Sequence, residues 1–128
     1  MIACVSVCLR SQRGILMYCL DAQAVVQLIR TVGLSSFMLR VIEQLQFDFK
    51  RWDAFHKTAR QVTHHAAGVL ELMPCSDDQY YSFKYVSGHP NNPKKGQRSV
   101  VALGMLATQM DGHPVLLCDM TYLTAIRT

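Results

Sequence analysis

Two charged residues stand inside segments that otherwise resemble half-buried β-strands. Glu71 lies in the run GVLEL, and Lys84 lies in the run YYSFKYV. The run around Lys84 has the aromatic and β-branched residues of a strand, and Lys84 places a charge in the middle of it. A lysine in such a position most often simply points to water. If the two strands pair, however, the carboxylate and the ammonium group can face one cleft and bind the two ends of an amino acid.

The residues between these two runs predict that the strands form a hairpin. Ser76–Gln79 (SDDQ) is rich in short polar side chains, which hydrogen-bond to their own backbone in turns. Gly88, His89 and Pro90 then end the second strand. On that strand, the pattern places Phe83 and Tyr85 on the face opposite Lys84.

The N-terminal half predicts one short strand and two helices. The apolar run at 15–20 (ILMYCL) is typical of a strand, and Asp21 is placed to cap a helix that Gly33 ends in a left-handed conformation. Ser35 or Ser36 is expected to cap a second helix that runs to about Trp52. Its apolar stripe comprises Phe37, Val41, Ile42, Leu45 and Phe49.

The C-terminal half predicts further strands and one incomplete helix. The expected strands are Gln61–His64, Ser99–Gln109 and Val115–Cys118, the last two joined by a turn at Asp111-Gly112. Thr121 is a candidate cap for a helix that breaks off at Thr128. The fold class is therefore α+β, with two N-terminal helices packed on a mostly antiparallel sheet and a truncated helix at the end.

Composition narrows the possible functions. The chain of 128 residues has a net charge of +4, with dispersed basic residues, which disfavours nucleic-acid binding. No apolar run is long enough to cross a membrane. Five scattered cysteines without a CxxC pair suit free thiols and a cytoplasmic location, and no metal site is expected.

The first 16 residues fit the rest of the chain poorly. Arg10 and Arg13 interrupt their apolar stretches, and the segment lacks the order of charges and cleavage site of a signal peptide. We expect residues 1–16 to be an extraneous or poorly packed leader. Met17 is then a plausible start of a single domain covering 17–128.

Several motifs, in order, resemble the N-terminal part of the ornithine cyclodeaminase/mu-crystallin family. They are FDFKRWDAFHKTARQVTHH, GVLELMPCSDDQYYSFKYVSGHPNN and GMLATQMDGHPVLLCDMTYLTAIRT. The resemblance implies a substrate-binding and dimerisation domain, with a homodimer formed through the sheet. It also implies a cytoplasmic enzyme that converts L-ornithine to L-proline and ammonia with NAD, which removes and returns a hydride.

The resemblance also assigns roles to individual residues. Arg60, Lys84 and Arg127 match family residues that bind the substrate carboxylate, and Lys84 would also polarise the reacting centre. Glu71 matches the acid that handles the amino group and its proton. Ser99 stands where the family has a threonine near the cofactor, although its RSVV context departs from the family pattern. Without the resemblance, Arg60 and Arg127 would be taken as solvent-facing arginines.

The chain shows no GxGxxG motif and no βαβ unit after the last strand, so the NAD-binding domain is expected to be absent. We therefore expect an N-terminal fragment that is inactive alone. The alternatives are a non-catalytic amino-acid-binding or dimerisation module, a marginally folded remnant, or a ketimine reductase or amino-acid dehydrogenase of the same family.

Overall fold

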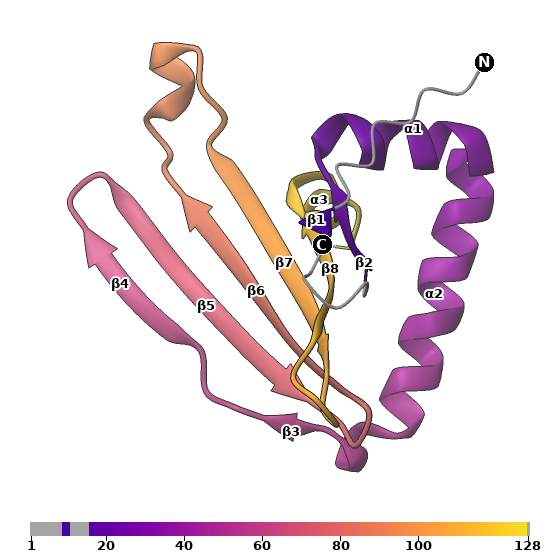
Figure 1. Cartoon of the computed structure of the whole chain (residues 1–128). Coiled ribbons are helices and arrows are strands. Elements are labelled where there is room, and N and C mark those ends of the chain that lie inside the picture. Colours follow the sequence, from indigo (N-terminus) through magenta and orange to yellow (C-terminus); the bar gives the residue numbers. More distant parts are fainter. Residues whose placement is uncertain (1–8, 11–15, 128) are drawn as a thin grey trace.

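The computed structural model describes residues 9–10 and 16–127, with side chains from residue 17 onward. Three α-helices are described: α1 (Ala22–Val32), α2 (Leu34–Lys50) and α3 (Thr121–Arg127). The strands are β1 (Leu9–Arg10), β2 (Leu16–Leu20), β3 (His56–Lys57), β4 (Gln61–His65), β5 (Gly68–Ser76), β6 (Tyr80–Gly88), β7 (Val100–Thr108) and β8 (Pro114–Asp119). The described residues thus have the α+β fold that the sequence predicts (Figure 1).

The strands of the described residues form one sheet in the order β1-β2-β8-β7-β6-β5-β3, with β4 also paired to β5. All pairs are antiparallel except β2 with β8, which is parallel. The predicted hairpin is confirmed, because β5 and β6 pair from Val69↔Gly88 to Ser76↔Tyr81 around the turn 77–79. The expected leader at 1–16 lies outside the described residues, except for the backbone of β1 and Leu16.

Asp77 organises the turn of this hairpin. Its carboxylate accepts hydrogen bonds from the backbone N–H groups of Gln79 at 3.0 Å and Tyr80 at 2.8 Å. It also forms an ion pair of 2.9 Å with Arg51, just beyond the end of α2. A single buried carboxylate therefore joins the hairpin to the long helix.

The helices α1 and α3 cover one face of the sheet. Val25 of α1, Ala102 of β7 and Cys118 of β8 are buried there. The hydroxyl of Thr121 accepts a hydrogen bond from the N–H of Ala102 at 3.0 Å. The prediction that Thr121 caps α3 is wrong, because Thr121 is the first residue of the helix itself and its side chain docks the helix on β7.

Gly33 ends α1 and begins α2. Asp21 caps α1 as predicted, by accepting a hydrogen bond from the N–H of Ala24 at 2.8 Å. Gly33 has φ +86° and ψ 133°, so its φ is positive but its ψ lies outside the left-handed helical region. Gly33, rather than Ser35 or Ser36, is the N-cap of α2, because the chain turns sharply enough there to start the new helix one residue later.

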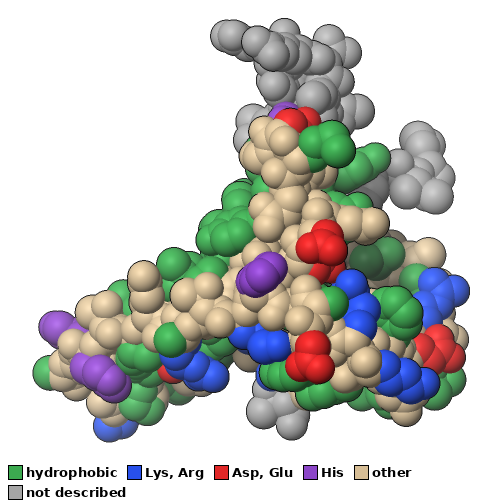
Figure 2. All heavy atoms as spheres, turned by 90° about the horizontal axis from the view of Figure 1, so that it is seen from below, with side chains coloured by type: hydrophobic (Ala, Val, Ile, Leu, Met, Phe, Trp, Pro, Cys, Tyr) green, Lys and Arg blue, Asp and Glu red, His purple; other side chains and the backbone are tan. Residues whose placement is uncertain are grey.

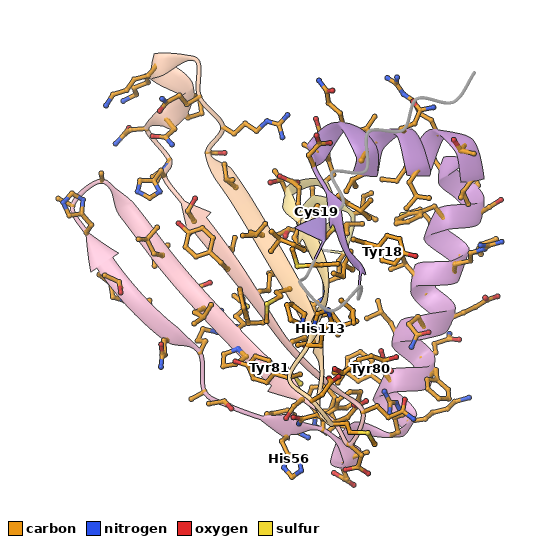
Figure 3. The ribbon with its side chains drawn as sticks, in the orientation of Figure 1. Tyr18, Cys19, His56, Tyr80, Tyr81 and His113 are labelled. Atoms are coloured by element: carbon orange, nitrogen blue, oxygen red, sulfur yellow. The ribbon has the colours of Figure 1, made fainter. Side chains whose placement is uncertain are left out.

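The helix α2 stands over the same side of the sheet but is not buried. No residue of α2 is buried, and charged and hydrophobic side chains lie side by side around its end when the molecule is seen from below (Figure 2). Tyr18 and Tyr80 lie on the side of the sheet that faces α2 and are 59% and 41% exposed (Figure 3). Among the described helices none is long and apolar enough to cross a membrane alone, although α1 and α2, bent by 100° at Gly33, pass that test as a pair by length and composition.

Candidate functional site

Lys84 lies in the middle of β6, between β5 and β7. Its direct neighbours across the two ladders are Met73 and Gly104. Gly104 has no side chain, and a Cβ built there would lie 2.8 Å from Cγ of Met120. The absence of this Cβ lets the start of α3 approach the sheet closely beside Lys84.

The residues of α3 form the other wall of a pocket around Lys84. The pocket measures about 270 Å³ and is lined by Met73, Lys84, Met120, Leu123, Thr124 and Arg127. The ammonium group of Lys84 lies 3.4 Å from the hydroxyl oxygen of Thr124. A half-buried ammonium group on the floor of an apolar pocket is a candidate site for an anionic group of a ligand.

Arg60 and Glu71 lie on the same face of the sheet. Glu71 pairs with Val62 of β4 and with Val86 of β6, and Val86 shares a face with Lys84. Arg60 directly precedes β4 and forms an ion pair with Glu71, with 3.2 Å between Nη1 and Oε1. Because the Arg60 side chain is 57% exposed and that of Glu71 22% exposed, this pair adds little to stability and leaves the arginine accessible.

The electrostatic environment of Lys84 disfavours its charge. Burial is the largest cause that lowers the pKa of Lys84, and the positive charges of Arg127 and Arg60 lower it further. The negative charge of Glu71 acts in the opposite direction. The charges of Lys84, Arg60 and Arg127 are thus opposed by one carboxylate, that of Glu71. The resulting excess of positive charge favours binding of a ligand carboxylate.

Ser99 lies outside this pocket. It belongs to the segment before β7, and its carbonyl oxygen accepts a hydrogen bond of 2.7 Å from the N–H of His89. Ser99 lines a second hollow, of about 670 Å³, beside α3. Thr124 lines both hollows, so the two adjoin across α3.

The structure therefore brings Arg60, Glu71, Lys84 and Arg127 to one face of the sheet and places Ser99 in the adjoining hollow. Thr124 and Gly104 were not among the site residues predicted from the sequence. Thr124 stands three residues before Arg127 and so shares its helix face, which was a usable signal. Within the described residues, no group of three or more His, Cys, Asp or Glu side chains could hold a metal ion.

Comparison with known proteins identifies relatives of this chain. The model of the ornithine cyclodeaminase/mu-crystallin family matches residues 22–128. An ornithine cyclodeaminase of Agrobacterium fabrum is 41% identical over 109 residues, which are 85% of this chain and 31% of that protein.

Two solved structures share the fold. A lysine cyclodeaminase, studied for its recognition of L-lysine, L-ornithine and L-2,4-diaminobutyric acid, has a TM-score of 0.79 at 23% identity, covering 87% of this chain and 35% of its own. An archaeal alanine dehydrogenase dimer with bound NAD has a TM-score of 0.70 at 29% identity, covering 87% and 33%. The chain thus spans about a third of the length of these relatives.

Proposed function

This chain belongs to the ornithine cyclodeaminase/mu-crystallin family, and we propose that it supplies the L-ornithine-binding part of an NAD-dependent ornithine cyclodeaminase. The observation that carries the proposal is that Lys84 and Arg127 line one pocket, while the Arg60–Glu71 pair lies close enough to act electrostatically on Lys84. We propose that the chain binds the substrate amino acid in this pocket.

In this proposal different residues bind the α-carboxylate and the α-amino group of the substrate. Lys84 and Arg127 bind the α-carboxylate, and Arg60 completes this cationic wall. Glu71 accepts a hydrogen bond from the α-amino group, and it can do so while paired with Arg60 because a carboxylate has several acceptor positions. Burial and the charges of Arg127 and Arg60 lower the pKa of Lys84, which is the direction expected for a lysine that exchanges a proton during catalysis.

The cofactor in this proposal is NAD, which would supply hydride transfer at the α-carbon when bound. The Ser99 residue lines a hollow that adjoins the amino-acid pocket across Thr124, so its hydroxyl is suitably located to donate a hydrogen bond to a bound dinucleotide. We assign Ser99 this contact and no role in binding ornithine.

Calorimetric titration of the chain tests the amino-acid site. We expect L-ornithine to bind with one site per chain, and putrescine, which keeps both nitrogen groups of ornithine but lacks the carboxylate, to bind at least tenfold more weakly. Equal affinity for both ligands would contradict a site built around the carboxylate.

L-Alanine distinguishes the second candidate function, an amino-acid dehydrogenase, which the likeness to alanine dehydrogenase favours. L-Alanine has the same head group as ornithine but no side-chain amine. Clearly tighter binding of L-alanine than of L-ornithine would support this second function over ornithine cyclodeamination.

We also propose that two chains form a homodimer through the sheet face opposite Lys84. This face carries Leu70, Leu72, Phe83, Tyr85 and Leu103, and Leu103 is 38% exposed. Two copies of such an apolar face can pack against each other when the two chains are related by a twofold axis.

Sedimentation velocity tests the dimer. Leu103→Asp places a charge on the proposed interface and should give a monomer. Val62→Asp makes the same kind of change at a side chain of similar exposure, 39%, on the Lys84 face, and should leave the dimer intact. A wild-type chain that sediments as a monomer at all concentrations, or two variants that behave alike, would refute this interface.

We further propose a cytoplasmic location. The cysteines in the part of the chain with described side chains, Cys19, Cys75 and Cys118, are all free thiols, as expected in a reducing compartment.

A further inference from the structure

A third hollow lies between α1, the first turn of α3 and the segment before β7, and it shares no lining residue with the pocket of Lys84. Gln23, Gln27 and Arg30 follow each other at intervals of four and three residues, so they lie on one face of the helix. Together with Arg98 and Tyr122 they line a hollow of about 500 Å³. This volume lies in the range of small-molecule sites.

Arg98 is held in place across this hollow from α1. Its Nη2 donates a hydrogen bond of 2.9 Å to the hydroxyl of Tyr122. The guanidinium carbon lies 4.9 Å from the centroid of the same ring, so the group also interacts with the aromatic face. These contacts fix the direction of Arg98 but use only part of its five N–H groups.

The charges of the hollow are all of one sign. Two guanidinium groups and two amide side chains line it, and no acidic residue does. Neither arginine forms an ion pair within the described residues. The nearest acid along α1, Asp21, accepts the hydrogen bond that caps the helix. The hollow thus offers hydrogen-bond donors and positive charge without a counter-ion.

We propose that this hollow binds a small oxyanion, held by Arg30 and Arg98 with Gln23 and Gln27 as additional donors. Planar guanidinium groups donate paired hydrogen bonds to carboxylates and phosphates alike, which is the chemistry that both ligand types share. The site is distinct from the amino-acid pocket, and the inference does not depend on the proposed function. Arg98 and Tyr122 also line the hollow of Ser99, so a ligand bound to Arg98 lies at the border of these two hollows.

Calorimetric titrations with inorganic phosphate and with succinate test the inference. We expect one of these probes to bind with one site per chain, and the identity of the tighter probe tells whether a phosphate or a carboxylate is preferred. Arg30→Gln and Arg98→Gln should each weaken this binding by about tenfold or more, because each removes a charge-assisted hydrogen bond. Tyr122→Phe, which keeps the ring but frees Arg98, should weaken it less.

Two control variants separate this site from other cations. Arg40→Gln makes the same change at an exposed arginine of α2 outside the hollow and should leave binding unchanged. Lys84→Ala removes the main cation of the amino-acid pocket and should also leave it unchanged. Anion binding that is lost in Lys84→Ala but kept in Arg30→Gln and Arg98→Gln would overturn the inference. So would the absence of binding of both probes at 10 mM, a concentration about a hundredfold above the dissociation constant of a typical metabolite site.

Discussion

Lys84→Met is expected to weaken L-ornithine binding by roughly a hundredfold and, at the same time, to stabilise the fold. The loss of affinity follows from the loss of a charge-assisted hydrogen bond to the carboxylate at the floor of the pocket. The gain in stability follows because the ammonium group is partly desolvated and faces the positive charges of Arg127 and Arg60. The thioether of methionine has a similar length and carries no charge, so it avoids both the desolvation of the ammonium group and its repulsion by the two arginines. Only the 3.4 Å contact with the hydroxyl of Thr124 is lost.

The pH dependence of this stability gain has a definite sign. The pKa of Lys84 is lower in the folded than in the unfolded chain, so between the two values the unfolded chain binds more protons. Wild-type stability therefore rises with pH across this window, up to the unfolded value of about 10.4. The advantage of Lys84→Met in thermal unfolding should be largest near pH 7 and shrink as the pH approaches 10.

The control for this prediction is Lys50→Met. It makes the same chemical change at an exposed residue at the end of α2 and should alter neither ornithine affinity nor the pH dependence. Binding and stability are read separately, by calorimetry and by thermal unfolding. A Lys84→Met chain that binds ornithine as well as wild type would remove Lys84 from the site, whatever its stability.

Asp77→Ala is expected to cause a large loss of stability, about 2–3 kcal/mol in the free energy of unfolding. The residue is 9% exposed, and its replacement leaves the N–H groups of Gln79 and Tyr80 without their acceptor. It also removes the ion pair with Arg51, which contributes a smaller share because the arginine side chain is 37% exposed. Denaturant unfolding measures the effect.

Two variants and the pH dependence identify the cause. Asp78→Ala, the exposed neighbour in the same turn, should cost less than 0.5 kcal/mol. Asp77→Asn keeps an acceptor oxygen and should lie between wild type and Asp77→Ala. Hydrogen bonds from Tyr80 and Gln79 and the charge of Arg51 lower the pKa of Asp77, so its contribution is present above the unfolded pKa and is lost as the pH falls through the folded value. Equal effects of Asp77→Ala and Asp78→Ala would contradict this account.

The local pattern predicted the elements well where side-chain alternation and turn chemistry act within a few residues. The β5–β6 hairpin and the cap at Asp21 are examples, since each depends on neighbours in the sequence. The predicted caps at Ser35 or Ser36 and at Thr121 were wrong because both helices begin earlier than the pattern indicated. The chain bends at Gly33, so α2 starts at Leu34. The hydroxyl of Thr121 accepts a hydrogen bond from the N–H of Ala102 on β7.

The site was predictable only in part, for the same reason. Period-two alternation placed Glu71 and Lys84 each on one face of its strand, but only the register shows that the two faces are the same. The assignments of Arg60 and Arg127 came from the family resemblance, since neither residue stands out in its own segment. The hollow around Arg98 was not foreseen, because it joins α1, α3 and the segment before β7, which are distant in the sequence.

The parallel pairing of β2 with β8 bears on the order in which the protein assembles. It joins Tyr18, Cys19 and Leu20 near the beginning of the chain to Leu116, Leu117 and Cys118 near its end. During synthesis, β2 therefore emerges from the ribosome long before β8 has been translated, and its backbone groups on that side are hydrogen-bonded to water until the two strands pair. Contacts of such large sequence separation form slowly, so we expect β2 and β8 to pair late, after the local hairpins have formed.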